Sequence, residues 1–396
     1  MADELAKGFA AILLRVSREA IRSPRELIGR EKVIGQILGS IYKRVPVIVV
    51  TGPKGIGKTS VLRVIESYLS DDKELGILHT KLGKIEAVKS TVPASFNDFR
   101  RMTPYPFYVS INRISEKFLV QELMKSLLTK AEVDSRLKGI ITEIAGAAKG
   151  IKKVKIGLEG IELERELEKE LTRVAHNEPL EILKTVCLKT RDKFPAGMLL
   201  ILDDADRLIG SNRSIRKFRE ELFRFIEDNR GLVQLIVCAY LDGSLLQPLK
   251  YSDEHAIGGL QESEAVQLIQ RSLGEVKKDV AVTIAKRVDY VPLYVVAVCL
   301  AIQDSSEFDE DRISQYIARA YESVVEELEP DLADLLRFLC RSDKPLTAAE
   351  IESNYGKGRT SVYTSLRLLT FFRLVEKSAQ KPARFSATRE LKDALE

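Results

Sequence analysis

The sequence predicts a parallel α/β fold that is followed by a helical region and a small C-terminal domain. A β-branched apolar run at residues 45–50 leads through a glycine-rich turn into a helix, and a second apolar run at 198–202 ends on two acids. Strands that alternate with helices in this way form a parallel sheet between two layers of helices. From Glu262 onward helical spacing replaces the strand pattern, which predicts the helical region.

The composition is that of an ordinary globular protein. A chain of 396 residues is long enough for two or three domains, and 45% hydrophobic and 30% charged residues are usual values. The net charge of +4 is too small to indicate nucleic-acid binding, so any basic surface must be local. The four cysteines stand far apart in apolar surroundings, which predicts buried, reduced thiols rather than disulfides or a zinc site.

The chain carries neither a signal-peptide pattern at its start nor a long apolar run. Its first residues lack a basic start and an apolar core, and no run approaches the roughly 20 apolar residues needed to span a bilayer. The sequence therefore predicts a cytoplasmic protein without a membrane partner.

The glycine-rich turn matches the phosphate loop, or Walker A motif, G-x-x-x-x-G-K-[ST]. Glycines let successive N–H groups turn inward around a phosphate, and the N-terminus of the following helix adds positive potential. Lys58 is then expected to reach the β- and γ-phosphates as a catalytic residue, and Thr59 to bind Mg²⁺. An accidental glycine turn is the alternative. The residues predicted to bind nucleotide here are Gly52, Pro53, Gly55, Gly57, Lys58, Thr59 and Ser60.

Two acids follow the apolar run at 198–202 and complete the predicted site as a Walker B motif. A strand that ends in an acid means little alone, but downstream of a phosphate loop it indicates the metal side of a nucleotide site. Asp203 is expected to hold the Mg²⁺ shell, and Asp204 to orient or deprotonate the attacking water as the second catalytic residue. The expected cofactors are ATP or ADP with Mg²⁺.

Hydrophobic spacing predicts the remaining elements of the α/β part. Helices are expected at 4–21, 58–69, 116–128 and 214–228, together with a short helix that ends at Tyr42. Further strands are expected at 107–111 and 232–239. An insertion at about 131–175 carries alternating residues at 154–158 and 161–163, which indicates a β-hairpin. Two interpretations of this insertion stay open: it covers an edge of the sheet, or it binds a partner.

The rest of the chain divides into a helical lid and a winged helix-turn-helix. Lid helices are expected around 266–273, at 280–302 with an interruption at Pro292, and at 312–326. After them come helices at 331–340, from Thr347 with its capping box, and at 360–372, and then short strands at 374–378 and 384–386. Three helices followed by a two-stranded wing are typical of the winged helix-turn-helix.

The winged region carries a local basic bias. No acid lies between Glu352 and Glu376, although several basic residues do, which favours contact with a DNA backbone. Winged helices also serve as protein-contact or lid modules, so that alternative stays open. The residues predicted to bind DNA are Lys357, Arg359, Tyr363, Thr364, Arg367 and Lys381.

Taken together, these motifs resemble archaeal ATPases of the STAND class, which are relatives of the AAA+ proteins. The resemblance covers nearly the whole chain outside the insertion and is carried by residues 27–31, 52–60, 199–204 and 291–293. It implies that Gly29 and Arg30 lie against the adenine and that Pro292 meets the nucleotide from the lid. Tyr290 occupies the glycine position of the family's Gly-x-Pro box. Archaeal origin-recognition initiators share the same layout.

The predicted protein is thus a Mg²⁺-dependent ATPase switch whose winged helix binds duplex DNA. Its domains would be a P-loop ATPase domain at 1–260, a helical lid at 261–328 and a winged helix at 329–396. One alternative is a nucleotide-gated signalling or defence module whose winged helix binds protein, and another is a replication initiator. A homo-oligomer or a protein partner stays open, and a small-molecule kinase is disfavoured because the last third of the chain has the pattern of a lid and a winged helix.

Overall fold

The computed structural model describes most of the chain in two compact units. The described residues are 27–70, 102–111, 116–147, 179–205, 213–239, 252–274, 276–305, 308–326, 328, 330–356, 358–371, 373–389 and 391–392. Among them, the second unit comprises residues 27–52 and those from Lys58 to Ala256. The first comprises Pro53–Gly57 and the residues from Ile257 on. The predicted helix at 4–21 and the predicted hairpin at 154–163 lie outside the described residues.

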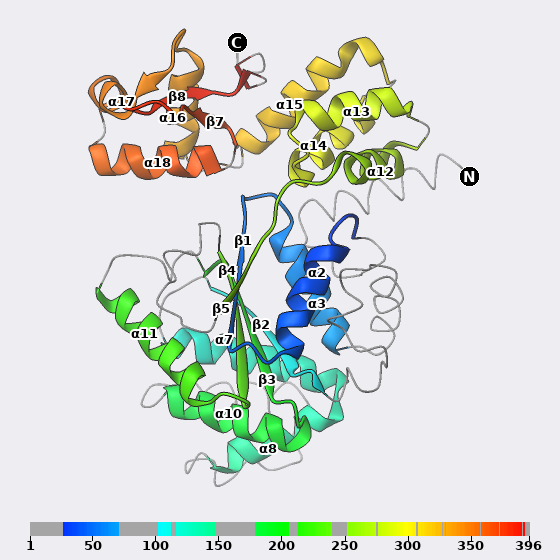
Figure 1. Ribbon diagram of the computed structural model, residues 1–396, viewed down its shortest axis with the longest axis vertical. Helices are drawn as coiled ribbons and strands as arrows, with labels where there is room; N and C mark the ends of the chain where they lie inside the picture. Colours follow the sequence, from blue (N-terminus) through cyan, green and yellow to red (C-terminus); the bar gives the residue numbers. More distant parts are fainter. Residues whose placement is uncertain are drawn as a thin grey trace. The chain divides into compact units, whose positions relative to one another are not determined.

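The second unit is a five-stranded parallel sheet with helices on both faces (Figure 1). Its strands lie in the order β2-β3-β4-β1-β5. The strands are β1 (Val47–Thr51), β2 (Tyr105–Ser110), β3 (Met198–Asp203), β4 (Val233–Ala239) and β5 (Ser252–Ala256), and the helices are α2 (Glu31–Tyr42), α3 (Lys58–Ser70), α7 (Glu116–Val133), α8 (Ser135–Ala147), α10 (Pro179–Lys193) and α11 (Arg213–Asp228). The predicted strands β1 to β4 and the predicted helices α2, α3, α7 and α11 are confirmed, whereas α8 and α10 were not predicted.

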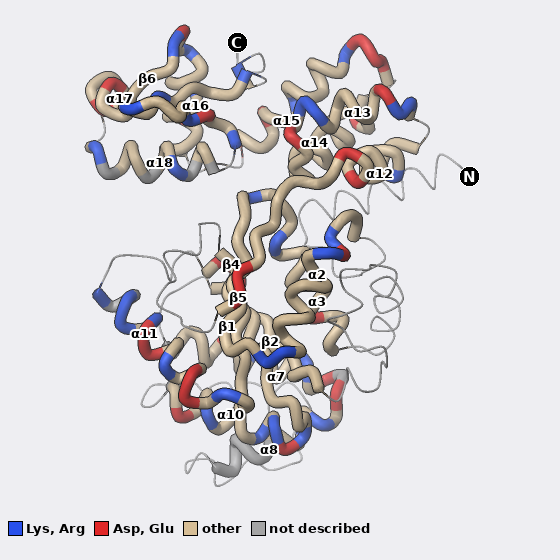
Figure 2. The backbone as a smooth tube through the Cα atoms, viewed as in Figure 1, with Lys and Arg blue, Asp and Glu red and all other residues tan. Residues whose placement is uncertain are grey.

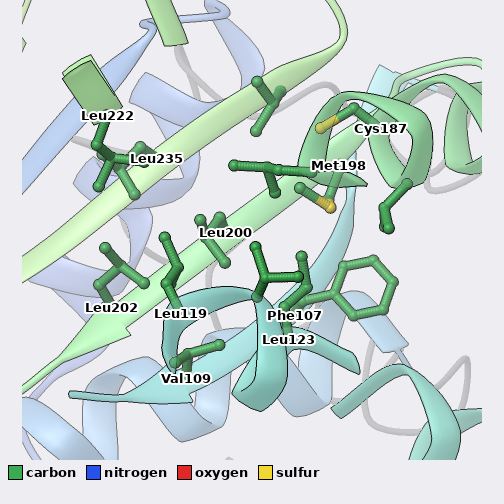
Figure 3. Close-up of a cluster of buried hydrophobic side chains, with 14 of the residues drawn as sticks. Phe107, Val109, Leu119, Leu123, Cys187, Met198, Leu200, Leu202, Leu222 and Leu235 are labelled. Carbon is green, nitrogen blue, oxygen red and sulfur yellow. The ribbon is translucent and has the colours of Figure 1, made fainter. Parts of the chain in front are cut away.

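One face of this sheet carries the core of the unit. Phe107, Leu200 and Leu235 point to this face from three adjacent strands, and α7, α8, α10 and α11 cover it (Figure 3). Strands buried on both faces read as continuous apolar runs, which is why residues 45–50 and 198–202 show no alternation. The opposite face lies against α2 and α3. Residues 199, 201 and 203 of β3 point to that face, because side chains alternate along a strand.

The sequence pattern missed strand β5. Its residues Ser252 to Ala256 contain two acids and a histidine, and the acidic colour of this strand stands out in Figure 2. β5 pairs in parallel with β1 at the edge of the sheet, so hydrogen bonds hold one side of its backbone. The strand can therefore form although it has no covered apolar face. Side chains add to this pairing, since the Ser40 hydroxyl donates to Asp253 at 2.7 Å and lies 2.9 Å from Nε2 of His255.

The first unit is helical except for a small antiparallel sheet. Its helices are α12 (Glu262–Leu273), α13 (Lys278–Arg287), α14 (Pro292–Gln303), α15 (Ile313–Glu326), α16 (Pro330–Cys340), α17 (Ala348–Tyr355) and α18 (Arg359–Phe371). The strands β6 (Leu346–Thr347), β7 (Val375–Lys377) and β8 (Arg384–Ala387) lie in the order β6-β8-β7. The predicted helices and both predicted strands are confirmed as elements. β6 was not predicted, because it is only two residues long and pairs with a distant strand.

Two local signals in this unit, a capping box and a proline, mark helix boundaries. The capping box at Thr347 is confirmed, since its hydroxyl accepts from the Glu350 N–H at 3.2 Å while the Glu350 carboxylate accepts from the Thr347 N–H at 2.6 Å. The bonds that the Glu350 carboxylate accepts from the Thr347 N–H and hydroxyl lower the pKa of Glu350 below its usual value. The predicted interruption of the 280–302 helix at Pro292 is also confirmed, because α13 ends at Arg287 and α14 begins at Pro292. At this first position of a helix the missing proline N–H costs nothing.

The four cysteines are free and buried, as predicted. Cys187 and Cys238 belong to the second unit, and Cys299 and Cys340 belong to the first. The most accessible of the four thiol residues, Cys340, is 4% exposed. In the part of the chain that the structure describes, no helix has both the length and the apolar character required to cross a membrane.

Candidate functional site

The glycine turn after β1 has the backbone that only glycine adopts freely. The φ angles of Gly55 and Gly57 are 75° and 91°, and that of Gly52 is 151°. A Cβ added at Gly57 would meet no atom within 4 Å, so the space above this residue is open. At Gly55 an added Cβ would lie 2.6 Å from Cβ of Leu293, a residue of the same unit. The N–H of Leu293 donates to the Gly55 carbonyl at 3.2 Å.

Lys58 opens α3 and is buried, although it is charged. The residue is 6% exposed, and its Nζ donates to the carbonyl of Gly52 at 2.8 Å. A lysine held across the loop in this way places its ammonium group near the N-terminus of the helix, where an anion is favoured. Thr59 and Ser60 occupy the first turn of α3 and are partly exposed.

The two acids lie at the carboxyl end of β3, as predicted for an α/β site. Asp203 is 2% exposed, and its Oδ1 accepts from the N–H of Asp204 at 3.0 Å. Asp204 is partly exposed and has a φ of 55°, a left-handed conformation that costs a residue with a side chain about 1–2 kcal/mol. Strain of this kind is often found at functional sites.

The neighbouring strand β2 supplies two polar side chains that sequence analysis missed. The hydroxyl of Tyr108 donates to Oδ2 of Asp203, and the hydroxyl of Ser110 donates to Oδ2 of Asp204 at 3.3 Å. β2 pairs with β3 in a register that sets Ser110 opposite Asp203. That register comes from strand pairing across some ninety intervening residues, so no local pattern in the sequence reveals it.

The charges of the loop lysine and of both acids act on the pKa of one buried thiol. Cys238, on β4 between β1 and β3, is 1% exposed. Burial raises the pKa of the Cys238 thiol most, the charges of Asp203 and Asp204 raise it further, and the charge of Lys58 lowers it. All four residues belong to the second unit, so this unit alone brings together the Walker A lysine and the Walker B acids.

The residues predicted to bind a metal suit Mg²⁺ chemically. Mg²⁺ prefers hard oxygen ligands, which the carboxylate of Asp203 and the hydroxyl of Thr59 provide. Both oxygens of Asp203 accept hydrogen bonds from the protein, Oδ1 from the Asp204 N–H and Oδ2 from Tyr108. The Cys238 thiol also forms a hydrogen bond with this carboxylate. An ionised carboxylate has about four lone-pair sites, so this one retains capacity for a metal or its water. Oxygen donors of this kind fit the predicted role of Asp203.

The residues expected near the adenine and in the lid adopt backbone conformations that suit their predicted positions. Gly29 has a φ of 70° and leads into Arg30, which precedes α2 and is 6% exposed. In the first unit Tyr290, the residue at the glycine position of the Gly-x-Pro box, has a φ of 55°. The position therefore adopts the backbone that glycine favours, even though a tyrosine occupies it. Pro292 follows two residues later at the start of α14.

The predicted DNA-binding residues lie mostly on α18. Arg359, Tyr363 and Arg367 are exposed and recur every four residues, which sets them on one face of the helix. The Arg359 guanidinium lies 5.8 Å from the centroid of the Tyr363 ring. Figure 2 shows basic but no acidic colour along α18. Lys381 is exposed between β7 and β8, whereas Lys357 and the side chain of Thr364 lie outside the described part.

Comparison with solved structures finds similar chains at low sequence identity, and the first one described here shares the fold. A Walker-type ATPase of Pyrococcus abyssi is 14% identical, with a TM-score of 0.56 over 95% of this chain and 98% of its own. A STAND protein with a tetratricopeptide repeat sensor from Pyrococcus horikoshii is 16% identical, with a TM-score of 0.38 over 95% of this chain and 44% of its own. Cdc6p from Pyrobaculum aerophilum is 16% identical, with a TM-score of 0.41 over 96% of this chain and 95% of its own.

Sequence comparison identifies the family of the α/β part. No curated protein sequence gives a match. The sequence profile of the AAA ATPase domain matches residues 26–225, which include the phosphate loop and both acids of β3. This match spans just over half of the 396 residues, and the parallel sheet with its glycine turn agrees with it. The chain belongs to the AAA ATPase domain family.

Proposed function

We propose that the protein is a Mg²⁺-dependent ATPase that acts as a nucleotide-controlled switch, and that its C-terminal region, residues 329–396, binds DNA. The observation that carries the ATPase part is the placement of Lys58 at the start of α3, bonded to the Gly52 carbonyl, with Asp203 and Asp204 at the carboxyl end of β3. Membership of the AAA ATPase domain family supports it.

Each residue of the site would have a distinct task. Lys58 would neutralise charge on the β- and γ-phosphates, and the N–H groups of the turn from Gly52 to Gly57 would hold them. Thr59 and Asp203 would hold Mg²⁺, which when bound supplies a Lewis acid to the phosphates. Asp204 would orient a water and accept its proton, because its carboxylate is partly exposed at the strand end.

Three further residues would complete nucleotide binding. Gly29 and the buried Arg30 would lie against the adenine, and Pro292 would meet the nucleotide from the lid. Gly55 and Leu293 already share a backbone hydrogen bond of 3.2 Å within the first unit. The turn Pro53–Gly57 of that unit is continuous in sequence with Gly52 and Lys58 of the second. The switch part of the proposal is that bound nucleotide changes how the two units are arranged.

The ATPase proposal is tested first by nucleotide binding. Lys58→Ala should weaken ATP binding about 10- to 100-fold, because a hydrogen bond to a charged group is worth ~1.5–3 kcal/mol. Lys54→Ala is the matched control, since Lys54 is an exposed lysine of the same turn. Titration with a fluorescent ATP analogue measures both. Equal affinities of the two variants would contradict the assignment of Lys58.

The DNA-binding part rests on the exposed face of α18. Arg359 and Arg367 stand two helical turns apart, a spacing suited to contact phosphates. Replacing both by alanine should weaken binding of a duplex and reduce its salt slope by about one unit per lost phosphate contact. Arg337→Ala combined with Arg341→Ala removes the same charge from α16 and the residue after it, and it should leave DNA binding unchanged.

A protein partner is the second candidate for the same surface. Tyr363 is 46% exposed at the centre of this face, and large exposed aromatic side chains are enriched where proteins bind each other. If the wild-type protein shows no affinity for duplex DNA at low salt, the protein-binding function is favoured. Binding confined to one origin-like sequence would instead favour a replication initiator.

A further inference from the structure

Tyr108 stands out among the described residues because its hydroxyl donates to Oδ2 of Asp203 from the adjacent strand. The residue is 8% exposed and lies on the face of the sheet that α2 and α3 cover. Asp203 is more deeply buried, at 2%. A buried carboxylate that accepts hydrogen bonds on both oxygens, here from the Asp204 N–H and from Tyr108, has its plane fixed.

The Tyr108 ring is in turn held by a chain of charged side chains. The guanidinium carbon of Arg63, on α3, lies 3.3 Å from the centroid of the ring, which is the geometry of a cation–π contact. Nη1 of Arg63 lies 2.8 Å from one oxygen of Glu66, and Nζ of Lys130 on α7 lies 2.9 Å from the other. α3 is the helix that begins with Lys58 and Thr59, so the same helix carries the phosphate-loop residues and the residue that holds Tyr108.

We propose that Tyr108 is a positioning residue that fixes the carboxylate of Asp203 for Mg²⁺, and that Arg63 holds the Tyr108 ring in place. This inference rests on the proposed ATPase function. Residues behind a metal ligand orient it, and their loss typically lowers metal affinity by about 10- to 100-fold. Tyr108 itself does not touch the nucleotide in this arrangement. Replacing it should therefore lower the affinity for Mg²⁺ and leave the affinity for nucleotide without metal unchanged.

The test is Tyr108→Phe, which removes only the hydroxyl. Tyr105→Phe is the matched control, because Tyr105 is a buried tyrosine of the same strand whose ring packs against Phe107 and Phe194 on the other face. The measured quantity is the affinity for a fluorescent ATP analogue as Mg²⁺ is titrated, together with the affinity in EDTA. Electron paramagnetic resonance of Mn²⁺ bound with ADP gives a second readout that does not depend on turnover.

We expect Tyr108→Phe to raise the Mg²⁺ concentration at half-maximal effect about 10-fold, while affinity in EDTA stays within about twofold of wild type. Tyr105→Phe should match wild type in both. A Mg²⁺ requirement for Tyr108→Phe equal to that of the control overturns the inference. If Tyr108→Phe does not fold, Arg63→Met is the test variant. It should raise the Mg²⁺ concentration at half-maximal effect by a smaller factor. No rise in that concentration would overturn the proposal. Failure of the ATPase function itself looks different: the wild-type protein would bind no ATP, or would bind it without regard to Mg²⁺.

Discussion

At the scale of single residues, the two acids at the end of β3 have different surroundings, which suit the different tasks proposed for them. Asp203 is buried and bonded through both oxygens, whereas Asp204 is partly exposed and has a left-handed backbone. A ligand to a metal benefits from a fixed carboxylate, and a group that activates water needs access to it. The different surroundings of the two acids thus support the separate roles predicted for them.

Asp204→Asn should slow ATP hydrolysis about 10²- to 10⁴-fold and leave ATP binding within a few-fold of wild type. The amide keeps the size of the side chain, and it can still accept the hydrogen bond from Ser110 through its oxygen, but it loses the charge that activates water. Phosphate release and analogue binding, measured on the same preparation, separate the two effects. Wild-type turnover in this variant would remove Asp204 from the catalytic assignment.

Tyr290 offers a second prediction at this scale. Its φ of 55° costs a side chain about 1–2 kcal/mol, and the cost rises for a β-branched residue. Tyr290→Gly should therefore keep the melting temperature of the protein near that of wild type, whereas Tyr290→Val should lower it by several degrees. The exposed hydrogen bond to Glu262, at 3.3 Å, contributes little that glycine would lose. A valine variant as stable as the glycine variant would contradict this account.

At the scale of elements, most strands and helices could be predicted because their apolar residues face a covered surface. β1, β3 and β4 are buried along their whole length, and α12 and α15 bury one side. β5 could not be predicted, because it has no buried apolar face of its own. Pairing with β1 and a hydrogen bond from Ser40 of α2 stabilise it instead. The roles of Tyr108 and Ser110 were missed for a related reason, because they depend on the register between β2 and β3.

The edge strand β5 should make stability depend on pH through His255. Burial lowers the pKa of His255 below 6.5, and the nearby Asp253 opposes this shift only in part. The native state then binds fewer protons than the unfolded state as pH falls below 6.5. The contribution of His255 to stability is therefore present above pH 6.5 and is lost as the pH falls toward the lower value of the folded protein.

Urea unfolding of wild type and of His255→Gln at pH 7.5 and 5.5 measures this effect. The wild-type protein should lose more stability between the two values than the variant does, because glutamine does not titrate. Ser40 lies 2.9 Å from Nε2 of His255 and can contact the glutamine side chain as well. Parallel losses in the two proteins would show that other groups carry the pH dependence.

At the scale of the whole molecule, a line of contacts inside the first unit joins the glycine turn to the C-terminal region. Gly55 bonds to Leu293 of α14, and the corner just before that helix carries Asp289. Arg373, which follows α18, forms an ion pair with the Asp289 carboxylate and donates to its carbonyl at 3.4 Å. Both Asp289 and Arg373 have left-handed backbones. Nucleotide bound at the turn is therefore expected to influence the C-terminal region.

Truncation after Leu328 should preserve nucleotide binding but change the rate of ADP release or of ATP turnover. The truncated chain lacks Arg373, so Arg373→Ala in the full-length protein should shift the ADP off-rate in the same direction. Arg341→Ala, an exposed arginine of the same region, serves as the control. By linkage, DNA must alter nucleotide affinity by the same factor as nucleotide alters DNA affinity. Equal off-rates in full-length and truncated proteins, with and without DNA, would contradict the coupling.

The burial of every cysteine has a practical consequence for studying this switch. Because none of the four thiols is more than 4% exposed, reagents that attack accessible cysteines should pass over all of them. One cysteine introduced at Lys217 on α11 and another at Tyr363 on α18 could then be tagged in the otherwise natural chain, since both positions are exposed. Pulsed dipolar spectroscopy between these tags would yield the separation of the two units with ATP, with ADP and with neither.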